Sequence, residues 1–312
     1  MGVGVDLFLR QVTGERPTKG VVDHPGHKDF LGVIYLSARE GVGPRRATTR
    51  DAGAHFLRYL GAWPCMLGTL ARAWLNNSPT RLQKRERSMK LHYHPASTTS
   101  RIVELFVRDQ GIDLEYQLVD LFTGAHKEPG FEKLNPNRLV PVLEDGGFFL
   151  TESSAIVKYI AEKCGSAAYP TDLQARAQVN EMMDWFNANF YKDFGYGFIY
   201  PQLYPHHKRA NDAQQAGAIS WGKQKALHWL QILDERLIGP HNNYLCGVTI
   251  TLADYQGAEI ISLGDLIRCE YPDFPNVSRW MNTMRSLPSW GTVNAAAEDF
   301  ALSLKEQTFI AI

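Results

Sequence analysis

The sequence predicts an α/β domain followed by an all-helical domain. Between residues 89 and 163, a strand–helix–strand pattern precedes a short helix, two strands and a further helix. From residue 173 to near the end, apolar residues recur at helical spacing instead. Residues 1–88 follow neither pattern. We therefore expect the fold to lie within residues 89–312.

The chain has the composition of a soluble globular protein. Of its 312 residues, 44% are hydrophobic and 21% are charged. No run of 18 uncharged apolar residues occurs, so no membrane span is expected. The four cysteines are scattered, without a CxxC pair or a zinc spacing, and fit a reducing compartment. These features predict a cytoplasmic protein without a metal site.

The net charge is zero, but the charges are distributed unevenly. Residues 1–88 carry 14 Lys and Arg against 7 Asp and Glu, whereas residues 89–312 carry 19 against 26. The acidic larger part argues against nucleic acid as a partner. The head is rich in Gly, Pro and charge, which are loop or disorder signals. We expect a basic N-terminal extension outside the native fold, produced by translation from upstream of Met89, or else a basic tether for acidic partners.

The first domain, residues 89–168, begins with a βαβ unit. Residues 90–94 alternate into a short strand, residues 100–110 have amphipathic helical spacing, and Gly111 ends that helix. Residues 114–118 form the second strand, and the connection between the two strands is expected to be right-handed.

The second half of this domain is predicted as αββα. A loop and short helix cover residues 123–134, and strands at 140–143 and 148–150 are joined by a Gly-containing turn. A helix over residues 153–163 ends at Gly165. The complete order, βαβ-αββα, is that of a thioredoxin-like domain.

A polar linker at residues 165–171 leads to the helical domain, which we place at residues 176–304. Thr251 and Asp254 predict a capping box, in which a hydroxyl and a carboxylate satisfy free backbone amides at a helix start. The expected helices, joined by turns that contain Pro and Gly, cover residues 173–190, 216–237, 252–267 and 277–287.

The segment NPNRLVPVLEDGGFFLTESSAI, residues 135–156, combines two features that suit a small acidic peptide. Val140 and Pro141 stand at the start of a strand, where they can present an unpaired backbone edge. Glu152 and Ser153 stand where a helix opens, and a helix N-terminus is a ready site for a carboxylate. The segment therefore predicts a peptide-binding site.

This segment resembles the glutathione-binding half of a glutathione transferase. With LHYHPASTTSR before it, and with HKEPGF and TESSAI, the pattern is most similar to the serine-type theta class. The resemblance covers residues 89–312 and implies that the catalytic hydroxyl belongs to Ser97. Neither a tyrosine nor a cysteine stands at that position, so the tyrosine-type and cysteine-type classes fit poorly.

The position of Ser97 before a helix gives its hydroxyl two possible roles. Ser and Thr commonly cap helices, and at least one hydroxyl in residues 97–100 is expected to do only that. A hydroxyl there could also donate to a thiolate. A free thiol ionises near pH 8.5, and one donor to a charged acceptor contributes roughly 1.5–3 kcal/mol, or about one to two pH units. Ser100 and Thr98 are the alternative donors.

The resemblance assigns the rest of the glutathione site motif by motif. Glu152 and Ser153 would hold the γ-glutamyl end, the first accepting from its ammonium group and the second donating to its carboxylate. Val140 would pair with the cysteinyl unit like an added strand, and a cis peptide bond at Pro141 would turn that edge outward.

Two residues concern the glycine carboxylate of glutathione. His126, in GAHKEP, resembles a theta-class residue near that carboxylate; the alternative is an ordinary surface-loop histidine. Arg138 stands one place earlier than the basic residue that the family often carries before Val-Pro, which argues against a direct contact.

An aromatic stretch predicts the side that faces the second substrate. Most of its members are expected in the core, and some should line an apolar pocket for small electrophiles. His206-His207 follows without a carboxylate or Cys in ligand spacing, so a metal site is not expected. The nine aromatic residues are Trp185, Phe186, Phe190, Tyr191, Phe194, Tyr196, Phe198, Tyr200 and Tyr204.

These features predict a glutathione transferase that conjugates the glutathione thiolate to small hydrophobic electrophiles, as in detoxification. The resemblance implies a homodimer, with glutathione as co-substrate and no metal or other cofactor. Dehalogenation or hydroperoxide reduction at the same site is the alternative reaction. A non-catalytic glutathione-binding or regulatory protein with this fold is the alternative to an enzyme.

Overall fold

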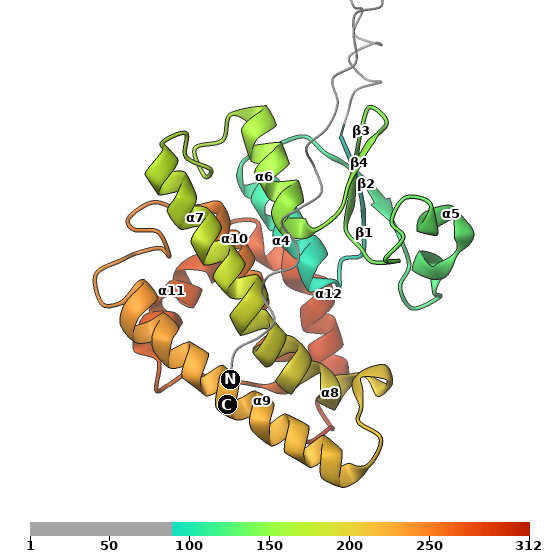
Figure 1. Cartoon of the computed structure of the whole chain (residues 1–312), viewed down its shortest axis with the longest axis vertical. Helices are drawn as coiled ribbons and strands as arrows, with labels where there is room; N and C mark the ends of the chain where they lie inside the picture. Colours follow the sequence, from blue (N-terminus) through green and yellow to red (C-terminus); the bar gives the residue numbers. More distant parts are fainter. Residues whose placement is uncertain (1–88) are drawn as a thin grey trace, which may run out of the picture. The chain divides into compact units, whose positions relative to one another are not determined.

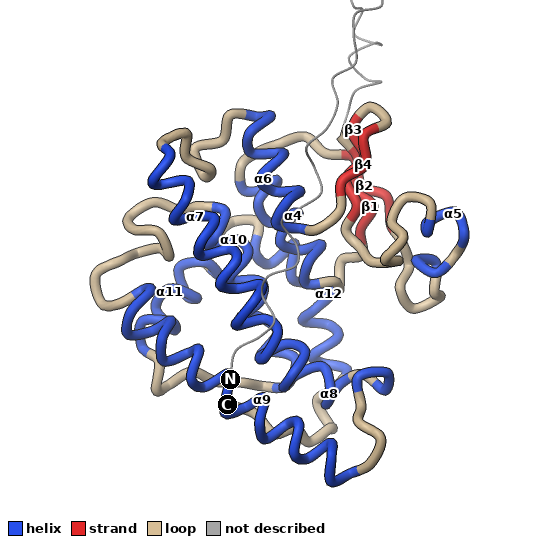
Figure 2. The backbone as a smooth tube through the Cα atoms, in the orientation of Figure 1, coloured by secondary structure: helices blue, strands red, loops and turns tan. Residues whose placement is uncertain are grey.

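A computed structural model describes residues 89–312 of the chain (Figure 1). The predictions for residues 1–88, an extension outside the native fold or a basic tether, concern residues outside this range. Within it, an α/β domain precedes an all-helical domain, as the sequence predicts. All strands of the described part lie in the first of these domains (Figure 2).

The sheet of the first domain has four strands in the order β2-β1-β3-β4. Strand β1 pairs in parallel with β2 and antiparallel with β3, and β3 pairs antiparallel with β4. Leu91 of β1 lies between Tyr116 and Leu143, which fixes the register. The strands are β1 (Lys90–Tyr93), β2 (Glu115–Leu118), β3 (Val142–Asp145) and β4 (Phe148–Leu150).

Helices cover both faces of this sheet. Helix α4 (Thr98–Asp109) and helix α6 (Ser153–Cys164) pack together on one face, whereas the short α5 (Pro129–Glu132) lies on the other (Figure 1). Gly165 ends α6 with a φ of 66°, in the left-handed region that glycine adopts without strain. This arrangement confirms the predicted thioredoxin-like domain.

Strand β3 begins two residues later than the sequence predicts. The sequence pattern places this strand at residues 140–143, whereas it covers Val142–Asp145. Pro141 has no backbone N–H to donate to a neighbouring strand, so pairing starts after it. Val140 and Pro141 therefore lie outside the sheet, immediately before β3.

The helical domain contains every predicted helix and more. Helix α7 continues without a break into a π-helical stretch (Phe186–Ile199), beyond the predicted end at residue 190. A 3-10 turn follows α8 and another follows α10, and a second π-helical stretch (Leu233–Ile238) follows α9. The α-helices are α7 (Leu173–Trp185), α8 (Tyr200–Leu203), α9 (Asp212–Ile232), α10 (Leu252–Ile261), α11 (Pro275–Arg285) and α12 (Trp290–Ser303).

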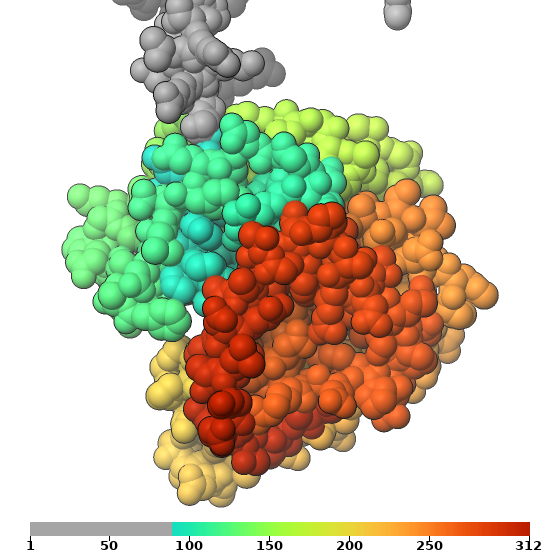
Figure 3. Space-filling model, turned by 180° about the vertical axis from the view of Figure 1, so that it is seen from behind, coloured from blue at the N-terminus to red at the C-terminus, as the bar shows by residue number. Residues whose placement is uncertain are grey.

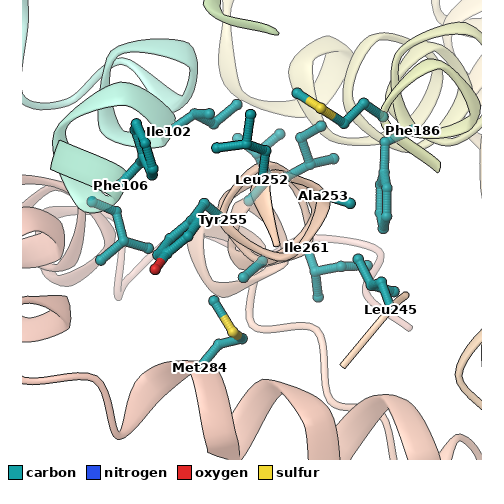
Figure 4. Close-up of a cluster of buried hydrophobic side chains, with 14 of the residues drawn as sticks. Ile102, Phe106, Phe186, Leu245, Leu252, Ala253, Tyr255, Ile261 and Met284 are labelled. Atoms are coloured by element: carbon teal, nitrogen blue, oxygen red, sulfur yellow. The ribbon is translucent and has the colours of Figure 1, made fainter. Parts of the chain in front are cut away.

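Helix α10 forms the centre of the molecule's apolar core. All ten of its residues are buried. Figure 4 shows Leu252 and Tyr255 of this helix surrounded by Phe106 from α4, Phe186 from the π-helical stretch and Met284 from α11. One core therefore joins the two domains.

The predicted capping box is present at the start of α10. The buried Asp254 carboxylate accepts from the Thr251 backbone amide at 2.8 Å and from the Thr251 hydroxyl at 2.9 Å. It also accepts from the Leu245 amide and from the Trp280 indole. Four donors thus satisfy a carboxylate that burial would otherwise strongly disfavour.

A buried ion pair also connects the two domains. Arg101 of α4 donates from Nε to Glu259 of α10 at 2.8 Å, and both side chains are almost completely buried. Asn294 of α12 donates to the other carboxylate oxygen. In Figure 3 the C-terminal residues lie directly against the first domain, which agrees with the packing of α12 on α4.

Residues 89–312 include no helix long and apolar enough to cross a membrane.

Candidate active site

Ser97 lies at the start of α4, in the turn between the first strand and this helix. It is the N-cap residue, and its Oγ accepts from the Ser100 backbone N–H at 3.4 Å. The side chain is half-buried, so its hydroxyl can meet a ligand. The cap role expected for one of the four hydroxyls therefore falls to Ser97.

The two alternative donors, Ser100 and Thr98, are less accessible. Ser100 is completely buried, and its Oγ accepts from the His94 backbone N–H at 3.4 Å. Thr98 is 5% exposed. Of the three candidates, Ser97 offers the most accessible hydroxyl.

Thr99 links the Ser97 turn to the segment that contains the proline. Its Oγ1 lies 3.1 Å from Ser97 Oγ and donates to the Val140 carbonyl at 3.1 Å. Two hydrogen bonds therefore join the predicted catalytic serine to the predicted peptide-pairing residue. In the sequence, the only signal for Thr99 is the run of four hydroxyl residues, which does not distinguish it from its neighbours.

Val140 and Pro141 form an edge without sheet partners. The peptide bond between them is cis, as expected. Val140 is largely buried, and no group among residues 89–312 accepts from its backbone N–H. The structure thus leaves one main-chain donor available at the position where peptide pairing is predicted.

Glu152 and Ser153 begin α6. Glu152 is exposed and has a φ of 65°, a left-handed value that is uncommon for a residue other than glycine. Ser153 is the first residue of the helix, where backbone amides lack partners within the helix. A strained residue beside free amides is a common arrangement where a ligand binds.

His126 lies in a 3-10 turn (Ala125–Lys127) between β2 and α5. Its Nδ1 is buried and has no hydrogen-bond partner in the described part of the chain. Burial, and to a lesser extent the charge of Lys127, lowers the pKa of His126. The imidazole is therefore neutral near pH 7, and its interaction with a carboxylate would rest on an N–H donor.

Arg138 already has a partner of its own. Its guanidinium donates to Glu132 at 2.8 Å, and both side chains are exposed. Its φ of 56° is another left-handed value. The ion pair agrees with the expectation that Arg138 makes no direct contact with the glycine carboxylate.

The aromatic stretch divides into a core set and a tyrosine set. Phe186, Phe190, Phe194 and Phe198 recur every four residues and are completely buried. In a π-helix, i→i+5 bonding gives more than four residues per turn, so this spacing keeps them near one face. Trp185, Tyr191 and Tyr200 are partly buried against the same core, so seven of the nine aromatics belong to the core or pack on it, in agreement with the expectation for most of them.

The tyrosines of the same stretch gather around His207. Tyr196 and Tyr200 have ring centroids 5.6 and 5.3 Å from that imidazole. The hydroxyls of Tyr191 and Tyr200 lie 2.7 Å apart. Burial raises the pKa of both tyrosines, so both hydroxyls stay protonated; one donates to the other, and one proton of the pair is left for another acceptor.

The tyrosine set borders the Ser97 turn. Burial is the main cause of the raised pKa of Tyr200, and the nearby Thr98 hydroxyl, on the residue after Ser97, acts in the opposite direction. Tyr200 therefore lies close to the turn. Among residues 89–312, no group of three or more His, Cys, Asp or Glu side chains could hold a metal ion.

Two family models match this sequence. The glutathione S-transferase N-terminal domain matches residues 96–163, which contain Ser97, Val140 and Glu152. The glutathione S-transferase C-terminal domain matches residues 200–288, which contain α9, α10 and α11.

Solved structures of several glutathione transferases resemble this one. A delta-class enzyme from Nilaparvata lugens is 30% identical, with a TM-score of 0.59, over 70% of this chain and 100% of its own. Human glutathione transferase theta-2, solved in complex with glutathione, is 27% identical, with a TM-score of 0.63, over 72% of this chain and 94% of its own.

An epsilon-class enzyme from Musca domestica is 25% identical, with a TM-score of 0.61, over 72% of this chain and 100% of its own. The presence of a theta-class enzyme among these structures agrees with the resemblance to that class. On the matches to both domains and to whole solved members, the chain belongs to the glutathione S-transferase family.

Proposed function

We propose that this chain conjugates the glutathione thiolate to small apolar electrophiles, and that the Ser97 hydroxyl donates a hydrogen bond to this thiolate. The observation that carries the proposal is the Thr99 bridge. It holds the serine turn and the Val140 edge together through two bonds of 3.1 Å. A tripeptide paired with Val140 through its cysteinyl unit would then carry its thiol toward Ser97.

The two ends of glutathione would be held by different elements. At the γ-glutamyl end, the exposed Glu152 carboxylate would accept from the ammonium group, and the free amides around Ser153 would bind the carboxylate. The unpaired N–H of Val140, next to Pro141, would donate to the cysteinyl carbonyl. Neutral His126 would donate an N–H to the glycine carboxylate.

The chemical step is a nucleophilic attack by sulfur. The Ser97 hydroxyl and the N-terminus of α4 favour the thiolate over the thiol. The thiolate forms a bond to carbon as the leaving group departs with the bonding electrons, for instance as halide. Holding both reactants in place supplies part of the rate. Glutathione is the co-substrate, and we propose no metal or other cofactor.

The tyrosine set supports an electrophile with an aromatic or apolar body. Tyr196 is half-exposed, and the hydrogen-bonded pair of Tyr191 and Tyr200 keeps one hydroxyl proton that can be donated to a polar group of the substrate. An apolar wall with a few donors suits small apolar molecules. A homodimer and a cytoplasmic location, which fit this function, are further parts of the proposal.

Replacing Ser97 by alanine tests the donor. Turnover of an aryl halide should fall about 10- to 100-fold, the effect of losing one bond of roughly 1.5–3 kcal/mol to a charged acceptor. Glutathione binding, measured by calorimetry, should persist, because Ser97 does not hold the peptide. Ser97→Thr keeps the hydroxyl and the helix cap and is the control. Unchanged turnover in Ser97→Ala would remove Ser97 as the donor.

A panel of other substrates tests the reaction itself. Haloalkanes and organic hydroperoxides would reveal dehalogenation or peroxide reduction at the same site. Glutathione binding without turnover of any electrophile would contradict an enzymatic role and indicate a binding or regulatory protein.

A further inference from the structure

Three groups in the free chain form a hydrogen-bonded series that runs in one direction. The Thr99 hydroxyl donates to the Val140 carbonyl, and its oxygen lies 3.1 Å from Ser97 Oγ. A hydroxyl has only one proton. Because that proton of Thr99 points to Val140, the proton between the two hydroxyls must come from Ser97. The Ser97 proton is therefore directed at Thr99.

Binding of the peptide would disturb this series at its far end. The Val140 carbonyl oxygen can accept two hydrogen bonds, so the cysteinyl N–H of glutathione, if it pairs with Val140 as an added strand, would share this oxygen with Thr99 and weaken the Thr99 bond. A Thr99 hydroxyl displaced from Val140 has Ser97 Oγ as its next acceptor, 3.1 Å away. Once Ser97 Oγ accepts from Thr99, the Ser97 proton is free to turn to the thiolate.

We propose that Thr99 is a positioning residue that couples occupancy of the Val140 carbonyl to the orientation of the Ser97 hydroxyl. The inference rests on the proposed function, because it needs both glutathione binding and a donor role for Ser97. A serine without this neighbour would not respond to peptide binding. Here the Ser97 proton is released from Thr99 when the peptide is in place. A hydroxyl that itself accepts a hydrogen bond is also a stronger donor.

This coupling predicts two effects of opposite sign when the Thr99 hydroxyl is removed. The peptide no longer shares the Val140 carbonyl with Thr99, so its backbone should bind more tightly. Ser97 loses its supporting donor, so the bound thiol should ionise less readily. If Thr99 only holds the proline segment against α4, the result should differ. Loss of its hydroxyl would then loosen the site and weaken peptide binding.

The experiment compares the full chain with its Thr99→Val variant, which has nearly the same shape without the hydroxyl. Affinity is measured by calorimetry with S-methylglutathione, which has the glutathione backbone but no ionisable thiol. The pKa of bound glutathione is measured from the ultraviolet absorbance of its thiolate as the pH is raised. Thr99→Ser, which restores the hydroxyl, should restore both values. Thr99→Ala provides a second variant without the hydroxyl, and thermal unfolding checks that each variant is folded.

The expected result for Thr99→Val is about two- to tenfold tighter binding of S-methylglutathione, the effect of removing one competing hydrogen bond. The pKa of the bound thiol should rise by up to about half a unit, which is about a threefold loss of thiolate near neutral pH. In a Ser97→Ala background, Thr99→Val should no longer change the thiol pKa, because its effect passes through Ser97.

Any other combination of results overturns the inference. Weaker binding of S-methylglutathione would make Thr99 a structural tie, and an unchanged thiol pKa would remove the coupling. Two outcomes would point beyond Thr99. If the unmodified chain does not bind glutathione, the proposed function fails with the inference. If Ser97→Ala leaves the thiol pKa unchanged, Ser97 is not the donor.

Discussion

The Ser97 hydroxyl can cap a helix and stabilise a thiolate at the same time, because the two roles use different parts of the group. The oxygen accepts from the Ser100 amide. The proton, which points to Thr99 in the free chain, is the part of the group that would donate to an anion. The single hydroxyl of Ser97 can therefore fill both roles that the sequence suggests for it, as the helix cap and as the donor to the thiolate.

The residue types of the candidate site are visible in the sequence, but their partners are not. Glu152 and Ser153 are found from a helix start, and Ser97 from the turn before another. Thr99 is missed because its acceptor, Val140, lies 41 residues further along the chain. The neutral state of His126 depends on burial, which sequence spacing does not reveal.

Glutathione affinity should depend on the charge of Glu152. Glu152→Gln keeps the size of the side chain but removes the acceptor charge for the γ-glutamyl ammonium. Binding should weaken about 10- to 100-fold, since a bond to a charged group contributes roughly 1.5–3 kcal/mol. Turnover at saturating glutathione should change little.

Calorimetry on Glu152→Gln and on Glu298→Gln provides the comparison. Glu298 is an exposed carboxylate on α12, and its replacement should leave the affinity unchanged. Equal affinities for both variants would show that Glu152 does not hold the ligand.

At the scale of elements, the sequence predicts which helices and strands exist better than where they end. The helix expected at residues 216–237 begins at Asp212, because Asn211 caps it by accepting from the Gln214 amide at 2.9 Å. Helix α12 was not predicted. It buries few side chains, chiefly Trp290, Val293 and Asn294, so its apolar periodicity is weak.

A glycine of α9 allows this helix and the π-helical stretch to pack backbone to backbone. A Cβ at Gly222 would lie 2.4 Å from the carbonyl oxygen of Gly197 and 2.9 Å from the amide nitrogen of Phe198. Backbone atoms cannot move aside as a flexible side chain can. This contact therefore requires glycine at position 222.

Gly222→Ala should destabilise the protein despite the better helix propensity of alanine. Forcing a methyl group into a packed interface costs about 1–3 kcal/mol. Gly217→Ala in the same helix is the matched control, because no atom lies within 4 Å of the added Cβ. That variant should be more stable by up to about 1 kcal/mol. Urea unfolding of both variants measures the difference, and a stabilised Gly222→Ala would refute the close approach.

At the scale of the whole molecule, one buried ion pair joins the two domains. The order of elements predicts both domains, but the partners Arg101 and Glu259 are 158 residues apart, so local patterns could not pair them. Arg101 also donates to the Ala96 carbonyl at 3.1 Å, directly before Ser97. The pair thus connects the turn that contains Ser97 to the central helix α10.

Breaking this pair should destabilise the protein far more than breaking an exposed one. Glu259→Ala leaves the Arg101 charge buried without its partner, which costs about 3–5 kcal/mol. Glu132→Ala breaks an ion pair with Arg138 that has the same length, 2.8 Å, but lies on the surface. That change should cost about 0–1 kcal/mol. Similar midpoints in urea unfolding would contradict the burial of the Arg101 pair.

The central claim is that the Ser97 hydroxyl stabilises the thiolate of bound glutathione. Its most direct test is the pKa of that thiol, measured from thiolate absorbance in the unmodified chain and in Ser97→Ala. We predict a pKa below the free value of about 8.5 in the unmodified chain, and a rise of about one to two units in the variant. The same thiol pKa in both proteins would contradict the claim.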